Sequence, residues 1–263
     1  MNRQIIRCGN YFGQKHMGVS TGAKNIFYGK KNTIISKVEQ DIFKTTSNLY
    51  FCHNNLKKNK KRITIGGDHS ISIASLAWTL NNYPKSKVIW IDAHADINTF
   101  ESSKTKNYHG MPLSFLTGMD YDKRFRFIKN KLNLNNLLYV GIRDLDSFEK
   151  EIIRDNNVEV LNVDNFNKNN FDKIFEFIGD NYYHLSFDVD ALDPKYLPCT
   201  GTPVNDGLDL ESFKNFIDQL TVDKMINMDM VELNLSLGDN NDFDKSLKTI
   251  IEIEEALSKK KLF

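Results

Sequence analysis

The stretch VIWIDAHAD, residues 88–96, decides how this 263-residue chain folds. Its apolar run predicts a strand over Lys87–Ile91 that is buried on both faces, as in a parallel sheet covered by helices. Polar residues follow at every second position, so the side chains of Asp92, His94 and Asp96 share one face of an extended chain. In parallel α/β sheets, ligands bind beyond the carboxyl ends of the strands. The stretch therefore predicts a buried strand with a functional site at its end.

Outward from this stretch, predicted strands alternate with predicted helices. The other predicted strands are Arg62–Ile65, Leu137–Ile142, Val158–Val163, Tyr182–Phe187 and Met225–Leu233. The predicted helices are Ile71–Leu80, Phe148–Arg154, Phe171–Ile178, Leu210–Leu220 with Asp209 as its cap, and Phe243–Leu257. This alternation predicts a three-layer α/β/α fold with a mostly parallel central sheet. Because the chain has no internal repeat and no linker rich in proline, serine or glycine, we expect a single domain over residues 1–263.

Composition argues against several classes of function. The 35 Lys and Arg residues balance 34 Asp and Glu residues, so the chain lacks the basic excess of a nucleic-acid-binding protein. No apolar run approaches the ~20 residues of a membrane span, and residues 1–10 lack the apolar core of a signal peptide. The three cysteines are widely spaced, which argues against a disulfide framework or a thiolate zinc site. We expect a cytoplasmic protein that binds neither nucleic acid nor a membrane.

Two further polar clusters follow predicted strands, GGDHS at 66–70 and DVD at 188–190. Either cluster alone could be a capped turn or a polar loop. Together with residues 92–96, they supply two imidazoles and four carboxylates: His69, Asp92, His94, Asp96, Asp188 and Asp190. Four adjacent carboxylates repel one another unless cations balance them, and two divalent cations carry the required charge. Oxygen-rich ligation without thiolates favours two Mn²⁺ ions, although the imidazoles leave Co²⁺, Fe²⁺, Ni²⁺ or Zn²⁺ open.

The chain resembles the ureohydrolase family of binuclear manganese enzymes, and most closely its arginase branch. The motifs that carry the resemblance occur in the family's order: GGDHS (66–70), DAHADIN (92–98), YHGMPLSFL (108–116), GIRDLD (141–146), SFDVDALDP (186–194), TGTPVNDGL (200–208) and VELNLSLGD (231–239). The segment GQKHMGVSTGAKNI (13–26) also resembles the family's opening turn. The resemblance implies an arginase-like fold, two bound Mn²⁺ ions, and hydrolysis of L-arginine to L-ornithine and urea.

The resemblance also implies a role for each matched residue. One ion is held by His69, Asp92, Asp96 and Asp188. The other is held by His94, Asp92, Asp188 and Asp190, so that Asp92 and Asp188 bridge the ions. The implied catalytic residues are Asp96 and His109 for proton transfer and Glu232 for the guanidinium. The implied substrate contacts are Asn98, Thr105 and Asn107 for an α-carboxylate, Asp146 and Glu149 for an α-ammonium, and Thr202 near the guanidinium.

The choice of substrate stays open at this point. His109 follows Asp96 by 13 positions, which resembles the longer loop of arginases rather than that of agmatinases. The alternatives are agmatine, guanidinobutyrate or a formimino compound as substrate, or a catalytically silent metal-binding protein. Lys106 stands in this loop where arginases have a small residue, so it either adds a charge contact or reshapes the pocket. Asp146 and Glu149 could also be ordinary acids of a helix N-terminus. A homo-oligomer is possible, but the short C-terminal segment leaves the oligomeric state open.

Overall fold

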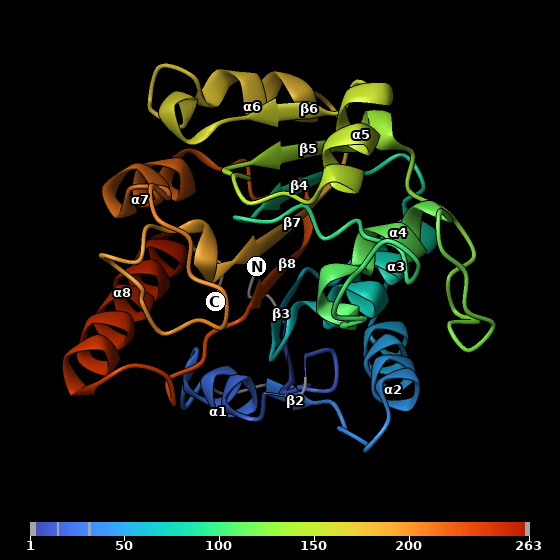
Figure 1. Ribbon diagram of the computed structural model, residues 1–263, viewed down its shortest axis with the longest axis horizontal. Helices are drawn as coiled ribbons and strands as arrows, with labels where there is room; N and C mark the ends of the chain where they lie inside the picture. Colours follow the sequence, from blue (N-terminus) through green and yellow to red (C-terminus); the bar gives the residue numbers. More distant parts are fainter. Residues whose placement is uncertain (1–3, 15, 31–32, 261–263) are drawn as a thin grey trace.

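The computed structural model describes residues 4–14, 16–30 and 33–260. Within these residues, a single all-parallel sheet of eight strands runs through the molecule in the order β2-β1-β3-β8-β7-β4-β5-β6 (Figure 1). The strands are β1 Gln4–Cys8, β2 Thr33–Ile35, β3 Arg62–Gly66, β4 Lys87–Ile91, β5 Leu137–Val140, β6 Glu159–Leu161, β7 Tyr183–Asp188 and β8 Met225–Val231. The helices of the described residues are α1 Gly18–Asn25, α2 Ile42–Asn55, α3 Ser72–Asn82, α4 Pro112–Thr117, α5 Ser147–Asp155, α6 Phe171–Ile178, α7 Leu210–Gln219 and α8 Asn240–Lys259.

Helices cover both faces of the sheet, which confirms the predicted three-layer α/β/α fold. On β4, Ile89 and Ile91 point into one apolar cluster, to which α1, α6, α7 and α8 contribute. The alternate residues Val88 and Trp90 point into a second cluster with α2, α3, α4 and α5. In Figure 1, α7 and α8 accordingly lie on one side of the sheet, and α2, α3 and α4 lie on the other. Burial on both faces explains why β4 is an uninterrupted apolar run.

Most differences from the predicted boundaries have local causes. The strand β4 and the helix α6 match their predicted ranges. The strand β5 ends earlier than predicted because Gly141 follows it with a positive φ of 85°. The helix α8 begins earlier than predicted because Asp239 caps it, with the Asp242 backbone N–H donating to Asp239 Oδ1 at 2.9 Å. The sequence analysis missed β1, β2 and α1 altogether.

A polar cluster is buried between the sheet and α3. Asp229 on β8 accepts hydrogen bonds from Ser72 and Ser75 of α3, at 2.8 Å and 2.5 Å, and lies 3.0 Å from His184 Nε2 on β7. All four side chains are fully buried. Burial acts to raise the pKa of Asp229, but His184 outweighs it and lowers the pKa to about 2. The cluster therefore fixes α3 against β7 and β8 through charge-assisted hydrogen bonds.

The order of the strands determines where a site can form. The neighbouring strands β3, β8, β7 and β4 are the ones followed by the polar motifs of the sequence. Because all four are parallel, their carboxyl ends lie along one edge of the sheet. No helix in the described ranges is both long and apolar enough to cross a membrane.

Candidate metal centre and active site

The first group of side chains surrounds His69, which begins a short 3-10 helix after β3. His69 Nδ1 lies 3.1 Å from Asp92 Oδ2, 3.0 Å from Asp96 Oδ2 and 3.2 Å from Asp188 Oδ2. This nitrogen is buried and has no hydrogen-bond partner among the described residues. Ligands that bind a cation at ~2.1 Å on adjacent octahedral corners lie about 3 Å apart. The spacing and the unpartnered nitrogen therefore fit a divalent cation.

Ser186 and Trp90 fix the orientation of the His69 imidazole. Its Nε2 lies 2.8 Å from Ser186 Oγ on β7, and its ring stacks on Trp90 with 4.2 Å between ring centroids and an interplanar angle of 7°. When Nε2–H donates to Ser186, the lone pair of Nδ1 faces the carboxylates, as a metal ligand requires. Trp90 Nε1 also donates to Asp92 Oδ2 at 3.0 Å, so one indole supports two of the predicted ligands.

The second group surrounds His94 in the loop after β4. His94 Nδ1 lies 3.5 Å from Asp92 Oδ1 and 3.2 Å from Asp190 Oδ2. The two groups share Asp92, which offers one oxygen to each. Asp188 contacts the first group directly and meets the second through Asp190, whose backbone N–H donates to Asp188 Oδ1 at 2.9 Å. The structure thus brings the six predicted metal ligands together in two adjoining groups that share Asp92.

Charge in these groups is strongly unbalanced without cations. Burial and the neighbouring Asp190 and Asp92 raise the pKa of Asp188 well above its usual value. Burial and Asp92 likewise raise the pKa of Asp96 to about 6. Burial acts to lower the pKa of His94, but Asp190 and Asp92 reverse this effect and raise it. Protons are therefore retained where a divalent cation would otherwise supply the positive charge, and binding a cation would release them.

Glu232 follows β8 and faces the same edge of the sheet. Its Oε1 accepts the backbone N–H of His69 at 2.8 Å and lies 3.3 Å from His109 Nδ1, while Gln14 Nε2 donates to its Oε2. Burial acts to raise the pKa of Glu232, but His109 outweighs it and lowers the pKa. In return, Glu232 raises the pKa of His109 to about 9 against the opposing effect of burial. The pair is therefore a carboxylate and an imidazolium near neutral pH.

Two of the predicted catalytic acids have an unusual backbone conformation. Asp96 has a φ of 50° and Glu232 a φ of 70°, both in the left-handed region that residues other than glycine rarely adopt. Such a conformation persists only where the surrounding structure enforces it, and it occurs often at functional sites. Here it turns both carboxylates toward the cluster at the strand ends.

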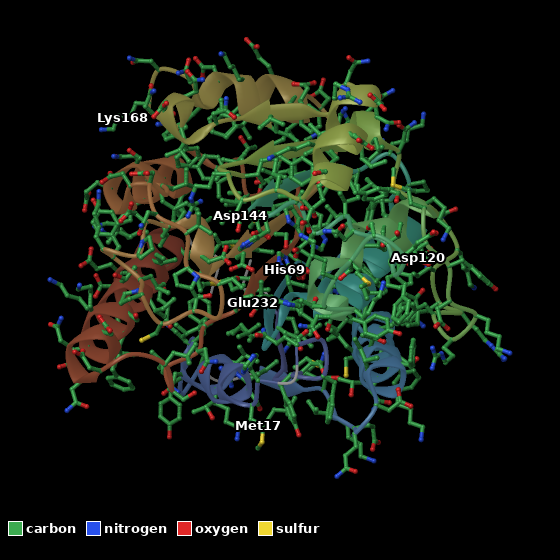
Figure 2. The ribbon with its side chains drawn as sticks, in the orientation of Figure 1. Met17, His69, Asp120, Asp144, Lys168 and Glu232 are labelled. Carbon is green, nitrogen blue, oxygen red and sulfur yellow. The ribbon has the colours of Figure 1, made fainter. Side chains whose placement is uncertain are left out.

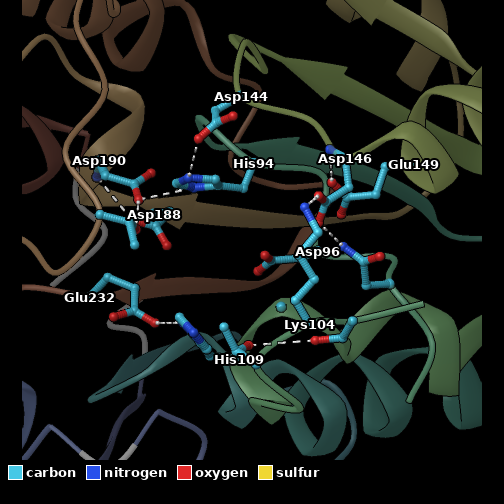
Figure 3. A pocket seen from close by; sticks show the side chains of 15 residues that line it. His94, Asp96, Lys104, His109, Asp144, Asp146, Glu149, Asp188, Asp190 and Glu232 are labelled. Carbon is cyan, nitrogen blue, oxygen red and sulfur yellow. Dashed lines mark hydrogen bonds and ion pairs between the residues drawn. The ribbon is translucent and has the colours of Figure 1, made fainter. Parts of the chain in front are cut away.

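A cavity of about 310 Å³ opens above these groups (Figure 3). The predicted site residues among its lining are His94, Asp96, Asn98, Thr105, His109, Asp146, Glu149, Asp188, Asp190, Thr202 and Glu232. His69 and Asp92 lie beneath its floor, each 1% exposed, and Figure 2 shows His69 and Glu232 near the centre of the molecule. Thr202 Oγ1 donates to Asp190 Oδ2 at 3.1 Å, so it supports a predicted metal ligand. The predicted contact Asn107 does not line the cavity.

At the outer end of the cavity, Asp146 and Glu149 serve two purposes. Asp146 is the N-cap of α5, and Glu149 Oε2 accepts the Asp146 backbone N–H at 3.0 Å, as at an ordinary helix start. Both side chains nevertheless line the cavity. Burial, followed by the nearby Asp96, raises the pKa of Glu149 to about 7. The helix-start interpretation therefore holds for both residues without removing them from the cavity.

Lys106 does not line the cavity, so of the two alternatives left open for it, the structure does not support a charge contact with a substrate. It has a φ of 58°, and its Nζ donates to the backbone carbonyls of Glu101, at 3.1 Å, and Phe100. These bonds place its charge on the outside of the loop. Lys104, two positions earlier, lines the cavity instead.

Some residues of the site were missed by the sequence analysis. Gln14 lies in the opening segment 13–26 and reaches Glu232, although no role was assigned to it. Asp144 lies in the GIRDLD motif, lines the cavity, and has Oδ2 3.9 Å from His94 Nε2. Ser186 lies in the SFDVDALDP motif and supports His69. All three fall inside the segments that carry the resemblance. A search of the GIRDLD and SFDVDALDP motifs for donors and acceptors could have found Asp144 and Ser186, whereas nothing local to Gln14 indicates its contact with Glu232.

The fold and the site define an α/β protein with a candidate metal centre at the carboxyl ends of its central strands. The chain belongs to the Arginase family, whose model matches residues 5–252. An arginase from Neurospora crassa is 40% identical over 207 residues, covering 72% of this chain and 58% of the relative. An arginase from Glaciozyma antarctica is 34% identical over 222 residues, covering 80% of this chain and 63% of the relative. The chain thus spans only about 60% of the length of these curated relatives.

Solved arginase structures match the chain over nearly its whole length. The arginase of Entamoeba histolytica, crystallised in complex with L-ornithine, has a TM-score of 0.86 and 26% identity and covers 98% of this chain and 99% of its own. The arginase of Bacillus subtilis has a TM-score of 0.84 and 27% identity and covers 98% of both chains. The predicted arginase-like architecture is therefore confirmed.

Proposed function

We propose that the protein is a binuclear manganese arginase that hydrolyses L-arginine to L-ornithine and urea. The observation that carries the proposal is the pair of histidine–aspartate groups that share Asp92 beneath a cavity flanked by Glu232 and His109. Membership of the Arginase family supports the same chemistry. The L-ornithine in the Entamoeba histolytica structure supports an amino acid as the ligand of this fold.

The residues present fit two divalent cations. His69, Asp92, Asp96 and Asp188 would hold one, and His94, Asp92, Asp188 and Asp190 the other, with Mn²⁺ favoured by the oxygen-rich donor set. When bound, divalent cations supply Lewis acidity, which lowers the pKa of water toward neutrality and stabilises developing negative charge.

The residues of the chain orient the substrate and move protons. Glu232 accepts hydrogen bonds from the guanidinium, and the backbone N–H of His69 and the amide of Gln14 hold this carboxylate in place. Asp96, which lines the cavity, accepts the proton that the attacking water gives up. His109, protonated near neutral pH, donates a proton to the leaving amine nitrogen and regains one from solvent. The hydroxyl on the reacting carbon gives its proton to solvent as it becomes the urea carbonyl, and the released amine takes up the proton held by Asp96. The products are then urea and a protonated amine, and both residues return to their starting states.

A substrate panel tests the proposal. The Mn²⁺-loaded protein should release urea from L-arginine and should prefer it to agmatine and guanidinobutyrate at equal concentrations. Equal turnover of agmatine or guanidinobutyrate would make the substrate assignment wrong and leave a guanidino hydrolase. No urea from any compound, with two ions bound, would indicate a catalytically silent metal-binding protein.

Elemental analysis tests the metal count separately. The wild-type protein should hold up to two ions per chain. Asp92→Asn should lose both ions or keep one weakly, because Asp92 offers an oxygen to each group. At most one ion on the wild-type chain under saturating Mn²⁺ would contradict the binuclear centre.

A further inference from the structure

The outer end of the cavity contains one cationic side chain in an acidic surrounding. Seven of the residues that line the cavity are Asp or Glu, and Lys104 is the one Lys or Arg among those that the structure describes there. Two divalent cations would balance the carboxylates of the floor. Asp146 is not among the residues that would hold these cations, and it forms an ion pair with Lys104 (Figure 3). Lys104 is therefore placed to interact with the outer end of a bound substrate.

Asp146 engages two donors at this end. Its Oδ2 accepts Asn98 Nδ2 at 3.0 Å, and its Oδ1 lies 3.8 Å from Lys104 Nζ. The amide of Asn98 is oriented by Ser102, whose hydroxyl donates to Asn98 Oδ1 at 2.8 Å. Asn98 is buried, whereas the side chain of Lys104 is 88% exposed. In the absence of a substrate, the carboxylate of Asp146 is thus the partner of both donors at this end of the cavity, Asn98 and Lys104.

We propose that Lys104 is a specificity-determining residue that, with Asn98, receives a carboxylate of the substrate in exchange for the carboxylate of Asp146. The inference rests on the proposed function and adds one residue, Lys104, to the contacts that the family resemblance implies for Asn98 and Asp146. An ammonium of the ligand binds Asp146, and the ligand carboxylate binds the two donors that Asp146 releases. One carboxylate replaces another, so every donor keeps an acceptor.

Other outer ends leave this exchange incomplete. The ammonium of agmatine pairs with Asp146 but offers no acceptor to Asn98, and it lies close to the like charge of Lys104. Guanidinobutyrate offers a carboxylate but no ammonium, so Asp146 loses its donors and gains no partner. Only a zwitterionic end offers a carboxylate to Asn98 and Lys104 and an ammonium to Asp146. The pair of Lys104 and Asp146 therefore distinguishes substrates by the charges at this end rather than by their length.

The neighbouring Lys106 provides a matched control in the same loop. It has the same charge two positions along the chain, but its Nζ is bonded to backbone carbonyls outside the cavity. Removing either charge changes the net charge of the protein equally. Only Lys104→Met removes a cation from the cavity. A difference between the two variants therefore reflects the place of the charge in the cavity and not the change in the net charge of the protein.

The test compares Lys104→Met, Lys106→Met and Lys104→Arg as Mn²⁺-loaded full-length proteins. The ratio of kcat/KM for L-arginine to that for agmatine should fall about three- to tenfold in Lys104→Met, mainly through KM for L-arginine. Lys104→Arg should keep the ratio, and Lys106→Met should leave it unchanged. An unchanged ratio in Lys104→Met, or an equal fall in Lys106→Met, overturns the inference.

Equilibrium binding separates this inference from the proposed function. L-Ornithine and putrescine differ by the same carboxylate, and calorimetry measures their Kd values without turnover. Lys104→Met should weaken L-ornithine about three- to tenfold and leave putrescine unchanged or tighter, less so at high salt. A wild-type protein that binds L-ornithine but releases no urea contradicts only the proposed function. If Lys104→Met binds L-ornithine as tightly as the wild-type protein does, or if the wild-type protein binds neither ligand, the role assigned to Lys104 is wrong.

Discussion

Replacing Ser186 by alanine should weaken one of the two proposed metal ions and spare the other. Ser186 Oγ lies 2.8 Å from His69 Nε2 and is fully buried on β7. Without it, Nε2–H has no acceptor, and the imidazole is free to carry its proton on Nδ1 instead. Nδ1 is the atom that faces Asp92 and Asp96 and would bind the ion. The substitution therefore acts on the basicity and tautomer of one ligand.

The size of the effect follows from these contacts. Leaving a buried donor without a partner costs about 1–3 kcal/mol, and loss of a partner behind a metal ligand usually weakens metal binding ~10–100-fold. Stacking on Trp90 keeps the ring in place, so the free energy of unfolding should fall by no more than the same amount, about 1–3 kcal/mol. Within the part of the chain that the structure describes, the close partners of the His94 ring are Asp92, Asp144 and Asp190 rather than Ser186, so the second ion should bind as in the wild-type protein.

Calorimetric titration of the metal-free protein with Mn²⁺ measures both affinities. Ser114→Ala is a matched control, because this buried hydroxyl donates only to a carbonyl of its own helix region, that of Met111 at 2.9 Å. Two ions bound to Ser186→Ala with wild-type affinity, or two ions weakened equally, would refute the reasoning about His69.

Three other results are expected. His109→Ala should keep both ions and lose ~10²–10⁴-fold in turnover, as measured by urea release; loss of metal would contradict a role in proton transfer. In metal-free protein, the contribution of His109 to the unfolding free energy should be complete below about pH 6.5 and lost as the pH rises through about 9, because Glu232 raises its pKa in the folded state. The difference between wild type and His109→Gln in urea denaturation should therefore shrink from pH 6.5 to 10, and a constant difference would exclude this linkage. Asp229→Asn should cost about 1–3 kcal/mol in urea denaturation, because it removes the buried carboxylate that accepts hydrogen bonds from Ser72 and Ser75, and an unchanged free energy of unfolding would show that this cluster does not stabilise the fold.

The sequence predicted the parts of the fold in which local pattern and burial agree. The run at 87–91 is apolar because both of its faces are covered, and it is the strand β4. In contrast, β1 pairs with β3, whose residues lie about 58 positions further along the chain, and β2 has only three residues at the edge of the sheet. Neither strand has a long enough pattern to identify it without its partner.

The candidate site shows the same division. The ligands were predictable because they follow apolar strands within short motifs. The contact of Gln14 with Glu232 spans 218 positions of sequence, and no local pattern indicates it. The orientations of Lys104 and Lys106 depend on a positive φ at a lysine, which local propensity disfavours and only the folded loop imposes.

The strand order has a consequence for the growing polypeptide on the ribosome. β8 is the last strand of the described chain to be synthesised, yet it lies between β3 and β7, which are made before it. Until it emerges, the nascent chain can form only two separate half-sheets, β2-β1-β3 and β7-β4-β5-β6, each with an open edge that attracts other strands. Insertion of β8 joins the halves and delivers Glu232 to the other side chains of the site. A polypeptide released before Met225 would therefore be both inactive and prone to aggregate.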